Sequence, residues 1–241
     1  MSNKHVLKKV TYLARHEVDS FIDNLACKNK VVTVGFLNQY GYNLISQLPE
    51  VKSIFFDLDY LLRDGFGIKL ACKYHGICPQ ENLNGTDLIP VIIKQLSLNS
   101  AEIKFFAYGT KQPWLEKGAK NLFQNKDFYQ LDGFRPEQSY VDHFREYGSL
   151  TTLNIVVLAM GMPKQERVAA RLKKNSSVSA IIICGGAILD FQANRYARAP
   201  LIFRKIGIEW LYRLYKEPKR MFYRYVIGIP KFFYYVIFTK G

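Results

Sequence analysis

The sequence lacks the patterns that assign several common functions directly. Its four cysteines have neither CxxC nor zinc-finger spacing, so we expect free thiols of a reducing compartment and no structural zinc. No GxGxxG or Walker motif is present, which disfavours a dehydrogenase or a P-loop enzyme. The four histidines have no partner spacing and no Ser-His-Asp arrangement is visible, so a histidine-based nucleophile mechanism has no support.

Long apolar runs are also missing. Residues 1–10 contain lysines but no apolar stretch of the kind that a signal peptide requires. The apolar runs at 225–230 and 232–238 are interrupted by Lys231 and fall short of the roughly 20 residues that span a bilayer. We therefore expect peripheral attachment to a membrane rather than insertion.

Acidic residues are scarce relative to basic ones, 20 against 34, which gives a net charge of +14. Residues 195–241 hold eleven Lys and Arg against two Glu, together with 13 of the 35 aromatic residues. A segment that is both basic and aromatic suits nucleic acid or an anionic membrane surface. No RNA- or DNA-binding motif accompanies it, so we expect the membrane surface as partner and no nucleic acid.

What the sequence does contain is the pattern of an α/β domain. Its 241 residues, 49% of them hydrophobic, suffice for one such domain with an appendage. Short runs rich in Val and Ile predict a Rossmann-like, mostly parallel sheet flanked by helices. Strands are expected at residues 6–13, 31–36, 53–56, 102–107, 153–159 and 180–184. We expect the catalytic domain over residues 1–197 and a basic amphipathic helical appendage over 198–241.

The appendage is expected to begin with a helix over residues 201–215 that continues or restarts at Pro218. Its cations at spacing four share one face, and its apolar residues share another. The two sets are Lys216, Arg220 and Arg224, and Met221, Phe222, Tyr225, Val226 and Ile229. Such a helix lies in a membrane interface, although a surface helix packed on the core with a solvated charged face is the alternative.

Two predicted strands end in glycine turns that carry polar residues. After 153–159 come Gly161 and Pro163, and proline suits a helix start because its φ is fixed. The first turn of that helix carries Lys164, Gln165 and Glu166. After 180–184 come Gly185, Gly186 and Asp190. Helix N-termini at this edge of a sheet bind anions such as a diphosphate, and an acid here can bind a ribose or donor hydroxyl; ordinary strand-to-helix loops are the alternative.

Several segments, taken in order, resemble a known family. They are DGFGIKLA at 64–71, NGTDL at 84–88, MGMPKQE at 160–166, GGAILDF at 185–191, RAP at 198–200 and IEWLYRLYKEPKR at 208–220. Together they resemble the WecG/TagA/CpsF glycosyltransferases (glycosyltransferase family 26) over roughly residues 30–230. Members of that family transfer a sugar from a UDP-sugar to a lipid-linked acceptor at the bacterial membrane surface.

The resemblance implies roles for particular residues. In the family the Asp of the Asp-Gly pair, here Asp64 with Gly65, lies in the catalytic pocket as the proposed general base. A carboxylate suits that task because the attacking hydroxyl needs a proton acceptor, although an acid at this position can also be only a helix cap. Thr33 and Asn38 are candidates to face the donor. Asn38 can equally cap the helix over 40–47, and the two roles are compatible.

The expected reaction is an inverting sugar transfer from a UDP-sugar to a polyprenyl-diphosphate-linked saccharide. Backbone N–H groups and Arg213, Arg220 and Arg224 are expected to stabilise the leaving diphosphate in place of a metal. Arg198, like the residues of the two glycine turns, is expected to bind substrate. The enzyme is expected at the cytoplasmic face of the bacterial inner membrane, and a homo-oligomer is left open. No motif selects the donor sugar.

Two features qualify this interpretation. Asp57 and Asp59 form a DxD after a predicted strand, which a metal-dependent glycosyltransferase could use, although a solvated turn is favoured. At Asn82 this chain departs from the family, where an Arg normally follows the Glu. Thr86 and Asp87 are expected to cap a helix over 88–96. The rival hypothesis is a non-catalytic basic α/β module that binds anionic membrane or nucleic acid.

Overall fold

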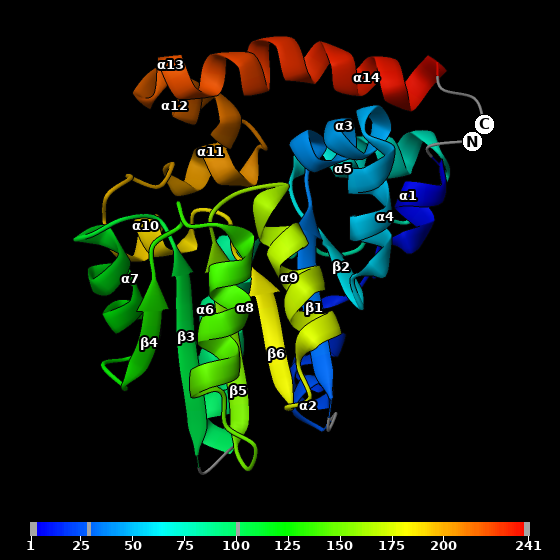
Figure 1. Ribbon diagram of the computed structural model, residues 1–241. Helices are drawn as coiled ribbons and strands as arrows, with labels where there is room; N and C mark the ends of the chain where they lie inside the picture. The colour runs from blue at the N-terminus through cyan, green and yellow to red at the C-terminus, as the bar shows by residue number, and fades with distance from the viewer. Residues whose placement is uncertain (1–3, 28–29, 100–101, 239–241) are drawn as a thin grey trace.

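The centre of the protein is a six-stranded sheet in the order β2-β1-β6-β5-β3-β4. A computed structural model describes residues 4–27, 30–99 and 102–238, and every neighbouring strand pair in it is parallel. The strands are β1 (Val31–Leu37), β2 (Tyr60–Arg63), β3 (Ile103–Gly109), β4 (Phe128–Leu131), β5 (Leu153–Ala159) and β6 (Ala180–Cys184). Their carboxyl ends therefore meet at one edge, at the top of Figure 1. The predicted Rossmann-like sheet is confirmed.

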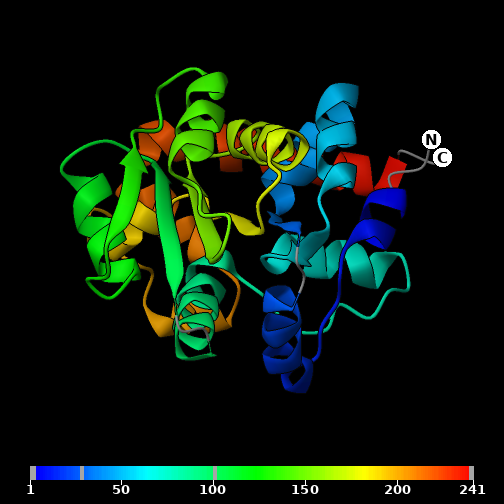
Figure 2. The same ribbon diagram turned by 60° about the horizontal axis from the view of Figure 1, so that its bottom comes forward.

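Helices cover both faces of the sheet (Figure 2). One hydrophobic cluster joins the sheet to α1 (Lys4–Lys9), α3 (Gln39–Gln47), α4 (Pro49–Asp57), α5 (Phe66–Tyr74), α8 (Glu137–Tyr147) and α9 (Lys164–Asn175). The other joins it to α2 (Val18–Ala26, after the 3-10 turn η1, Arg15–Glu17), α6 (Gly85–Asn99), α7 (Trp114–Leu122) and α10 (Ile188–Gln192). On β6, Ile182 belongs to the first cluster and its neighbours Ile181 and Ile183 to the second, because successive strand side chains point to opposite faces.

A helical appendage lies across the carboxyl edge of the sheet, orange to red in Figure 1. It consists of α11 (Leu201–Lys205), α12 (Glu209–Lys216), α13 (Pro218–Phe222), the π-helical segment η2 (Tyr223–Ile227) and α14 (Gly228–Phe238). Phe232 of α14 is buried and meets the ring of Tyr42 on α3 edge-on at 5.2 Å. The α3 side chains Asn43 and Gln39 donate to the carbonyl oxygens of Gly228 and Arg224 at 2.7 and 2.9 Å. These hydrogen bonds fix where the appendage sits.

Two of the predicted strands are wrong. Residues 6–9 belong to helix α1, and among the residues described before η1 the one β-bridge is that of Thr11 with Leu62. Residues 53–56 belong to α4, whose Pro49 stands at the helix start and whose Val51 and Phe55 bury one helical face at spacing four. The strand in this region is β2, which follows the DxD. The short strand β4 was not predicted at all.

The appendage also differs from its predicted form. The helix expected over 201–215 is broken at Gly207, which has φ +81° and lies so close to Phe66 that a Cβ there would approach the ring to 2.7 Å. The predicted apolar face is divided as well. Met221 and Tyr225 are buried and, with Gly228 and Phe232, continue one buried face at spacings of four and three, whereas Phe222 and Val226 lie one position further round the helix and are exposed.

Smaller corrections concern helix starts. Asn84, not Thr86 or Asp87, caps α6, since its side-chain oxygen accepts from the backbone N–H of Thr86 at 2.8 Å. Pro163 is the residue before α9 rather than its first helical residue. The strands predicted at 31–36, 102–107, 153–159 and 180–184 are confirmed within two residues. The division into a domain of 1–197 and an appendage of 198–241 stays a prediction, and residues 1–3 and 239–241 of those ranges lie outside the described part of the chain.

The contact of α14 with α3 yields a stability prediction. Phe232→Ala is expected to lower the free energy of unfolding by about 3–5 kcal/mol, because it removes a buried ring from the contact. Phe233→Ala, on the exposed side of the same helix, is expected to cost less than about 1 kcal/mol. Urea unfolding, with proteolysis of the appendage as a second readout, measures both. Equal losses for the two variants would contradict the docking described here.

Candidate active site

The carboxyl edge brings most of the predicted residues together because five strands end there in polar turns. Asn38 follows β1, Asp64 follows β2 and Thr110 follows β3. The glycine turns follow β5 and β6, and the appendage covers this edge (Figure 1). In open α/β sheets, this edge is where ligands bind. We therefore treat it as the candidate active site.

Asn38 and Asp64 are linked to each other at neighbouring strand ends. The Asn38 side-chain oxygen accepts from the backbone N–H groups of Tyr40 and Gly41 at 3.1 Å each, so it caps α3 as predicted. The Asn38 side chain also hydrogen-bonds the Asp64 carboxyl. Because the Asn38 oxygen already accepts two hydrogen bonds, its amide nitrogen is the donor to Asp64. Gly65 then turns the chain with φ +89° into α5.

The surroundings of Asp64 shift its proton affinity in opposing directions. Burial raises the pKa of the Asp64 carboxyl, and nearby Glu209 raises it further. The guanidinium of Arg213 is the largest opposing influence, with smaller ones from the hydrogen bond of Asn38 and from Arg224. The net effect is a pKa above the usual aspartate range. A carboxylate whose pKa lies closer to neutrality is a stronger base, which suits proton transfer from a hydroxyl group.

The three arginines predicted to act at the site each stack on an aromatic ring. Arg213 lies 5.0 Å from the centre of the Phe191 ring on α10, and Arg224 lies 5.0 Å from that of Tyr40 on α3. Arg220 lies 4.6 Å from the ring centre of Tyr196 in the linker before α11. Glu217 interrupts the chain between the helix of Arg213 and α13, whereas α13 runs directly into the π-helical segment that carries Arg224. Cation–ring contacts place each guanidinium over the carboxyl edge.

Arg213 is held more firmly than a surface cation. Its Nη2 donates to Glu209 at 2.6 Å. Burial opposes its charge, but Tyr225, Glu209 and Asp64 together raise the pKa of Arg213 above its usual value. Arg213 therefore stays charged beside the Asp64 carboxyl.

Gln165 and Glu166 tie the two glycine turns together beneath the edge. The backbone N–H of Gly186 donates to Gln165 Oε1 at 2.9 Å, and Gln165 Nε2 donates to Glu166 Oε1 at 2.8 Å. Both side chains are fully buried, and Glu166 Oε2 has no hydrogen-bond partner among the described residues. Burial raises the pKa of Glu166 to about 7. Gly161, with φ +80°, and Gly185 complete the two turns.

Asp190 belongs to a network that sequence reasoning only partly identified. Thr110 Oγ1 donates to Asp190 Oδ1 at 2.6 Å, and Arg195 Nη1 donates to the same oxygen at 2.9 Å. Thr110 and Arg195 were not among the predicted site residues. The position of Thr110, directly after a buried strand, is the one sequence signal that could have pointed to it.

Two predicted substrate-binding cations already have partners. Lys164 Nζ donates to the carbonyl oxygens of Gly133 and Arg135 at 2.9 and 2.7 Å, which holds the turn between β4 and α8. Arg198 makes a two-pronged contact with Asp87 on α6, at 2.6 and 2.9 Å. In this conformation both side chains fasten loops around the site.

Thr33 and the DxD lie at the opposite, amino-terminal end of the strands. Asp59 accepts from Thr33 Oγ1 at 2.8 Å and from Lys173 Nζ at 2.8 Å, and Thr33 is fully buried. Despite the opposing effect of burial, these hydrogen bonds hold the pKa of Asp59 below its usual range. Thr33 is therefore not at the ligand edge, and the DxD follows a helix rather than a strand. Within residues 4–27, 30–99 and 102–238, no group of three or more His, Cys, Asp or Glu is placed to hold a metal.

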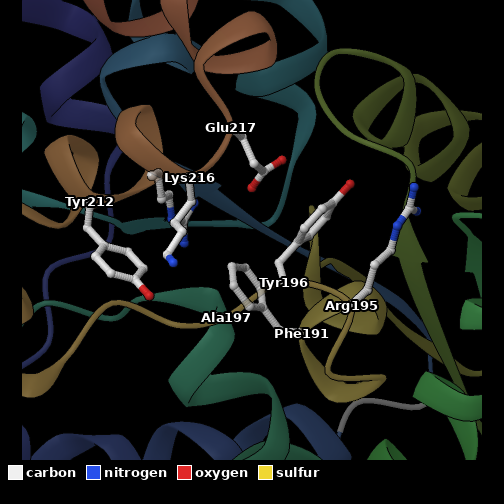
Figure 3. Close-up of a pocket in the computed structure, with 8 residues that line it drawn as sticks. Phe191, Arg195, Tyr196, Ala197, Tyr212, Lys216 and Glu217 are labelled. Atoms are coloured by element: carbon white, nitrogen blue, oxygen red, sulfur yellow. The ribbon is translucent and has the colours of Figure 1, made fainter.

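A pocket of about 210 Å³ opens where the appendage meets the core (Figure 3). It is lined by Phe191, Arg195, Tyr196, Ala197, Tyr212, Arg213, Lys216 and Glu217. Tyr212, Lys216 and Glu217 come from the appendage, whereas Arg195 points away from Tyr212 and Lys216 in this view. Cations and aromatic rings on a concave wall suit an anionic or carbohydrate ligand.

Fold and site together define a Rossmann-like α/β protein whose carboxyl edge gathers arginines, aromatic rings and carboxyl groups. The chain belongs to the WecG/TagA/CpsF family of glycosyl transferases, whose family model matches residues 6–241. This membership confirms the resemblance and favours an enzyme over a non-catalytic binding module. A similar protein is the N-acetylglucosaminyldiphosphoundecaprenol N-acetyl-beta-D-mannosaminyltransferase of Bacillus spizizenii strain W23. It is 25% identical over 224 residues, which cover 90% of this chain and 84% of the relative.

The buried Glu166 yields a prediction of pH dependence. Its pKa rises from 4.5 to about 7 on folding, so between these values the folded protein keeps a proton that the unfolded chain releases. The free energy of unfolding is therefore expected to fall, by roughly 3 kcal/mol from this group, as the pH rises from below 4.5 to above 7. Glu166→Gln keeps the acceptor for Gln165 and removes the titration, so its stability should vary less over this range. Urea unfolding at pH 5 and pH 8 compares the two proteins, and parallel pH dependences would contradict the assignment.

Proposed function

We propose that this glycosyltransferase transfers a sugar from a UDP-sugar to a polyprenyl-diphosphate-linked saccharide during the synthesis of a bacterial surface polysaccharide. The observation that carries the proposal is the Asp64 carboxyl, which is half-buried at the carboxyl edge of the sheet, where Arg213 and Arg224 act on its charge. The name of the Bacillus relative supports the acceptor class, because it describes a diphosphoundecaprenol-linked N-acetylglucosamine. A panel of UDP-sugars identifies the donor.

The proposed reaction is a single displacement at the anomeric carbon. The Asp64 carboxylate takes the proton of the acceptor hydroxyl as the oxygen attacks the anomeric carbon of the donor sugar. The new glycosidic bond forms while the bond from the anomeric carbon to the diphosphate oxygen breaks, and UDP leaves with the electron pair. Because attack and departure occur on opposite faces, the anomeric configuration inverts.

The leaving diphosphate needs positive charge where its own charge develops. In the proposal Arg213, Arg220 and Arg224 supply it, in a role that some glycosyltransferases assign to a metal ion. Their aromatic contacts hold them over the edge before substrate binds, so little reorganisation is needed in the transition state. The glycine turns, Gln165 and Asp190 are proposed to bind the donor at the same edge.

The decisive test measures sugar transfer by the Asp64→Asn variant. We expect kcat to fall by about 10²–10⁴-fold, because the base is lost while its shape is kept. UDP binding, measured by calorimetry, should remain within a fewfold. Asp57→Asn is the matched control, since Asp57 is exposed and lies before the amino end of β2. Activity of Asp64→Asn within a fewfold of the wild type would refute the base assignment.

The appendage carries an exposed apolar surface that supports peripheral membrane binding. Opposite the buried Phe232 and Val236, its helices expose Phe222, Tyr223, Val226, Ile227, Phe233, Tyr234, Ile237 and Phe238. The described part of the chain contains no helix long and apolar enough to cross a membrane. We propose that this surface, with the basic residues Lys219 and Lys231, rests on the cytoplasmic face of the inner membrane, where the lipid-linked acceptor is presented.

Membrane binding yields a further prediction. The double variant Tyr234→Ser/Ile237→Ser is expected to reduce binding to vesicles of anionic lipid by about tenfold or more, because two exposed apolar side chains are lost. Leu150→Ser is the control, since Leu150 is 83% exposed but lies just before β5, at the amino-terminal end of the sheet. Vesicle sedimentation measures both. Equal binding by the double variant and the wild type would exclude this surface.

A further inference from the structure

Arg63, the last residue of β2, is a buried cation directly before Asp64. It is 3% exposed, and burial lowers the pKa of its guanidinium. Its Nε donates to the Pro79 carbonyl at 2.7 Å, and its Nη2 donates to the Gln80 carbonyl at 3.1 Å. Its Nη1 donates to the Gly65 carbonyl at 3.2 Å. Within the described residues none of the ion pairs includes Arg63, so its direct hydrogen-bond acceptors are neutral oxygen atoms, while nearby Asp64 and Glu81 act on its charge from further away.

Asn82 completes the same cluster from the segment that follows α5. Its side-chain oxygen accepts from the backbone N–H of Gly65 at 2.7 Å and lies 3.5 Å from Arg63 Nη1. The backbone of this segment is fixed as well, since the N–H of Leu83 donates to the Arg63 carbonyl at 3.0 Å. The turn at Gly65 is thus held at its N–H by Asn82 and at its carbonyl by Arg63.

We propose that Asn82 is a positioning residue for Asp64, acting together with Arg63 through the Gly65 turn. This inference rests on the proposed role of Asp64 as the base. Gly65 has a φ of +89° and turns the chain directly after Asp64. The contacts that hold this turn therefore set the direction of the Asp64 side chain. Because a misplacement of about 1 Å can cost a catalytic group about 10²-fold, the Asn82 hydrogen bond controls the reaction without touching substrate.

The chemistry of this cluster also explains why asparagine suits position 82 here. An arginine, which the family resemblance leads one to expect, has only donors and offers no acceptor to the Gly65 N–H. It would also bring a second guanidinium to Arg63, which is buried. Asparagine supplies a neutral acceptor that serves both donors.

The test compares Asn82→Ala, Asn82→Asp and Asn82→Arg with the wild type in sugar transfer. Asn82→Ala and Asn82→Arg are expected to lower kcat by about tenfold or more, with the KM for the UDP-sugar within about twofold. Asn82→Asp should recover most of kcat, because a carboxylate oxygen accepts from Gly65 and pairs with Arg63. In amide hydrogen exchange, Gly65 should exchange faster in Asn82→Ala and regain protection in Asn82→Asp.

Asn84→Ala is the matched control, because Asn84 lies two residues away and caps α6. It should lower stability and leave both kcat and Gly65 exchange unchanged. An unchanged kcat in Asn82→Ala, a rise in KM alone, or failure of Asn82→Asp to recover kcat would each overturn the proposal. If Asp64→Asn is active, the base assignment fails, whereas Gly65 exchange still reports on the Asn82 hydrogen bond. The two failures are therefore distinguishable.

Discussion

The electrostatic influence of Arg213 on Asp64 links the appendage to the carboxyl edge of the sheet at the candidate site. Asp64 follows β2 directly, whereas Arg213 belongs to α12, a helix close to the carboxyl end of the sequence. The Arg213 guanidinium lowers the pKa of the Asp64 carboxyl, whereas burial raises it. The basicity of Asp64 thus depends on whether the appendage is docked.

Aromatic rings and side-chain amides provide that docking. Phe191, Tyr40 and Tyr196 each support one arginine, while the side-chain amides of Gln39 and Asn43 donate to the carbonyl oxygens of Arg224 in the π-helical segment and of Gly228 at the start of α14. A π-helical turn leaves some carbonyls poorly paired, so the α3 amides compensate for its cost. The same helix that buries Phe232 exposes apolar residues on its other side. In the proposed function, the appendage therefore carries both the apolar surface that meets lipid and the arginines that act on the base.

Local sequence patterns correctly predicted two kinds of element: those that neighbouring residues stabilise, and strands that are buried on both faces. The strands β1, β5 and β6 are short runs of mostly apolar residues, rich in Val and Ile, and β5 and β6 run into glycine turns. The pattern failed at 53–56, where Ser-Ile-Phe-Phe is short enough for either structure, and Val51 and Phe55 decided for the helix through their contact with the sheet. It failed again at β4, whose half-buried residues have no strong periodicity. Short segments are decided by what they contact.

The sequence by itself was enough to predict the fold class and the family. It also identified the helix cap at Asn38, the two glycine turns and the acidic residue at position 64. These follow from residues close in the chain, whose geometry the backbone fixes. Only the tertiary structure decided that Thr33 and Asp59 bind each other at the far end of the strands, and that Asp190 meets Thr110 and Arg195. It alone showed that Arg63 and Asn82 hold the Gly65 turn. The reason is physical: a parallel sheet gathers residues by strand order, and strand order depends on long-range contacts that no local pattern encodes.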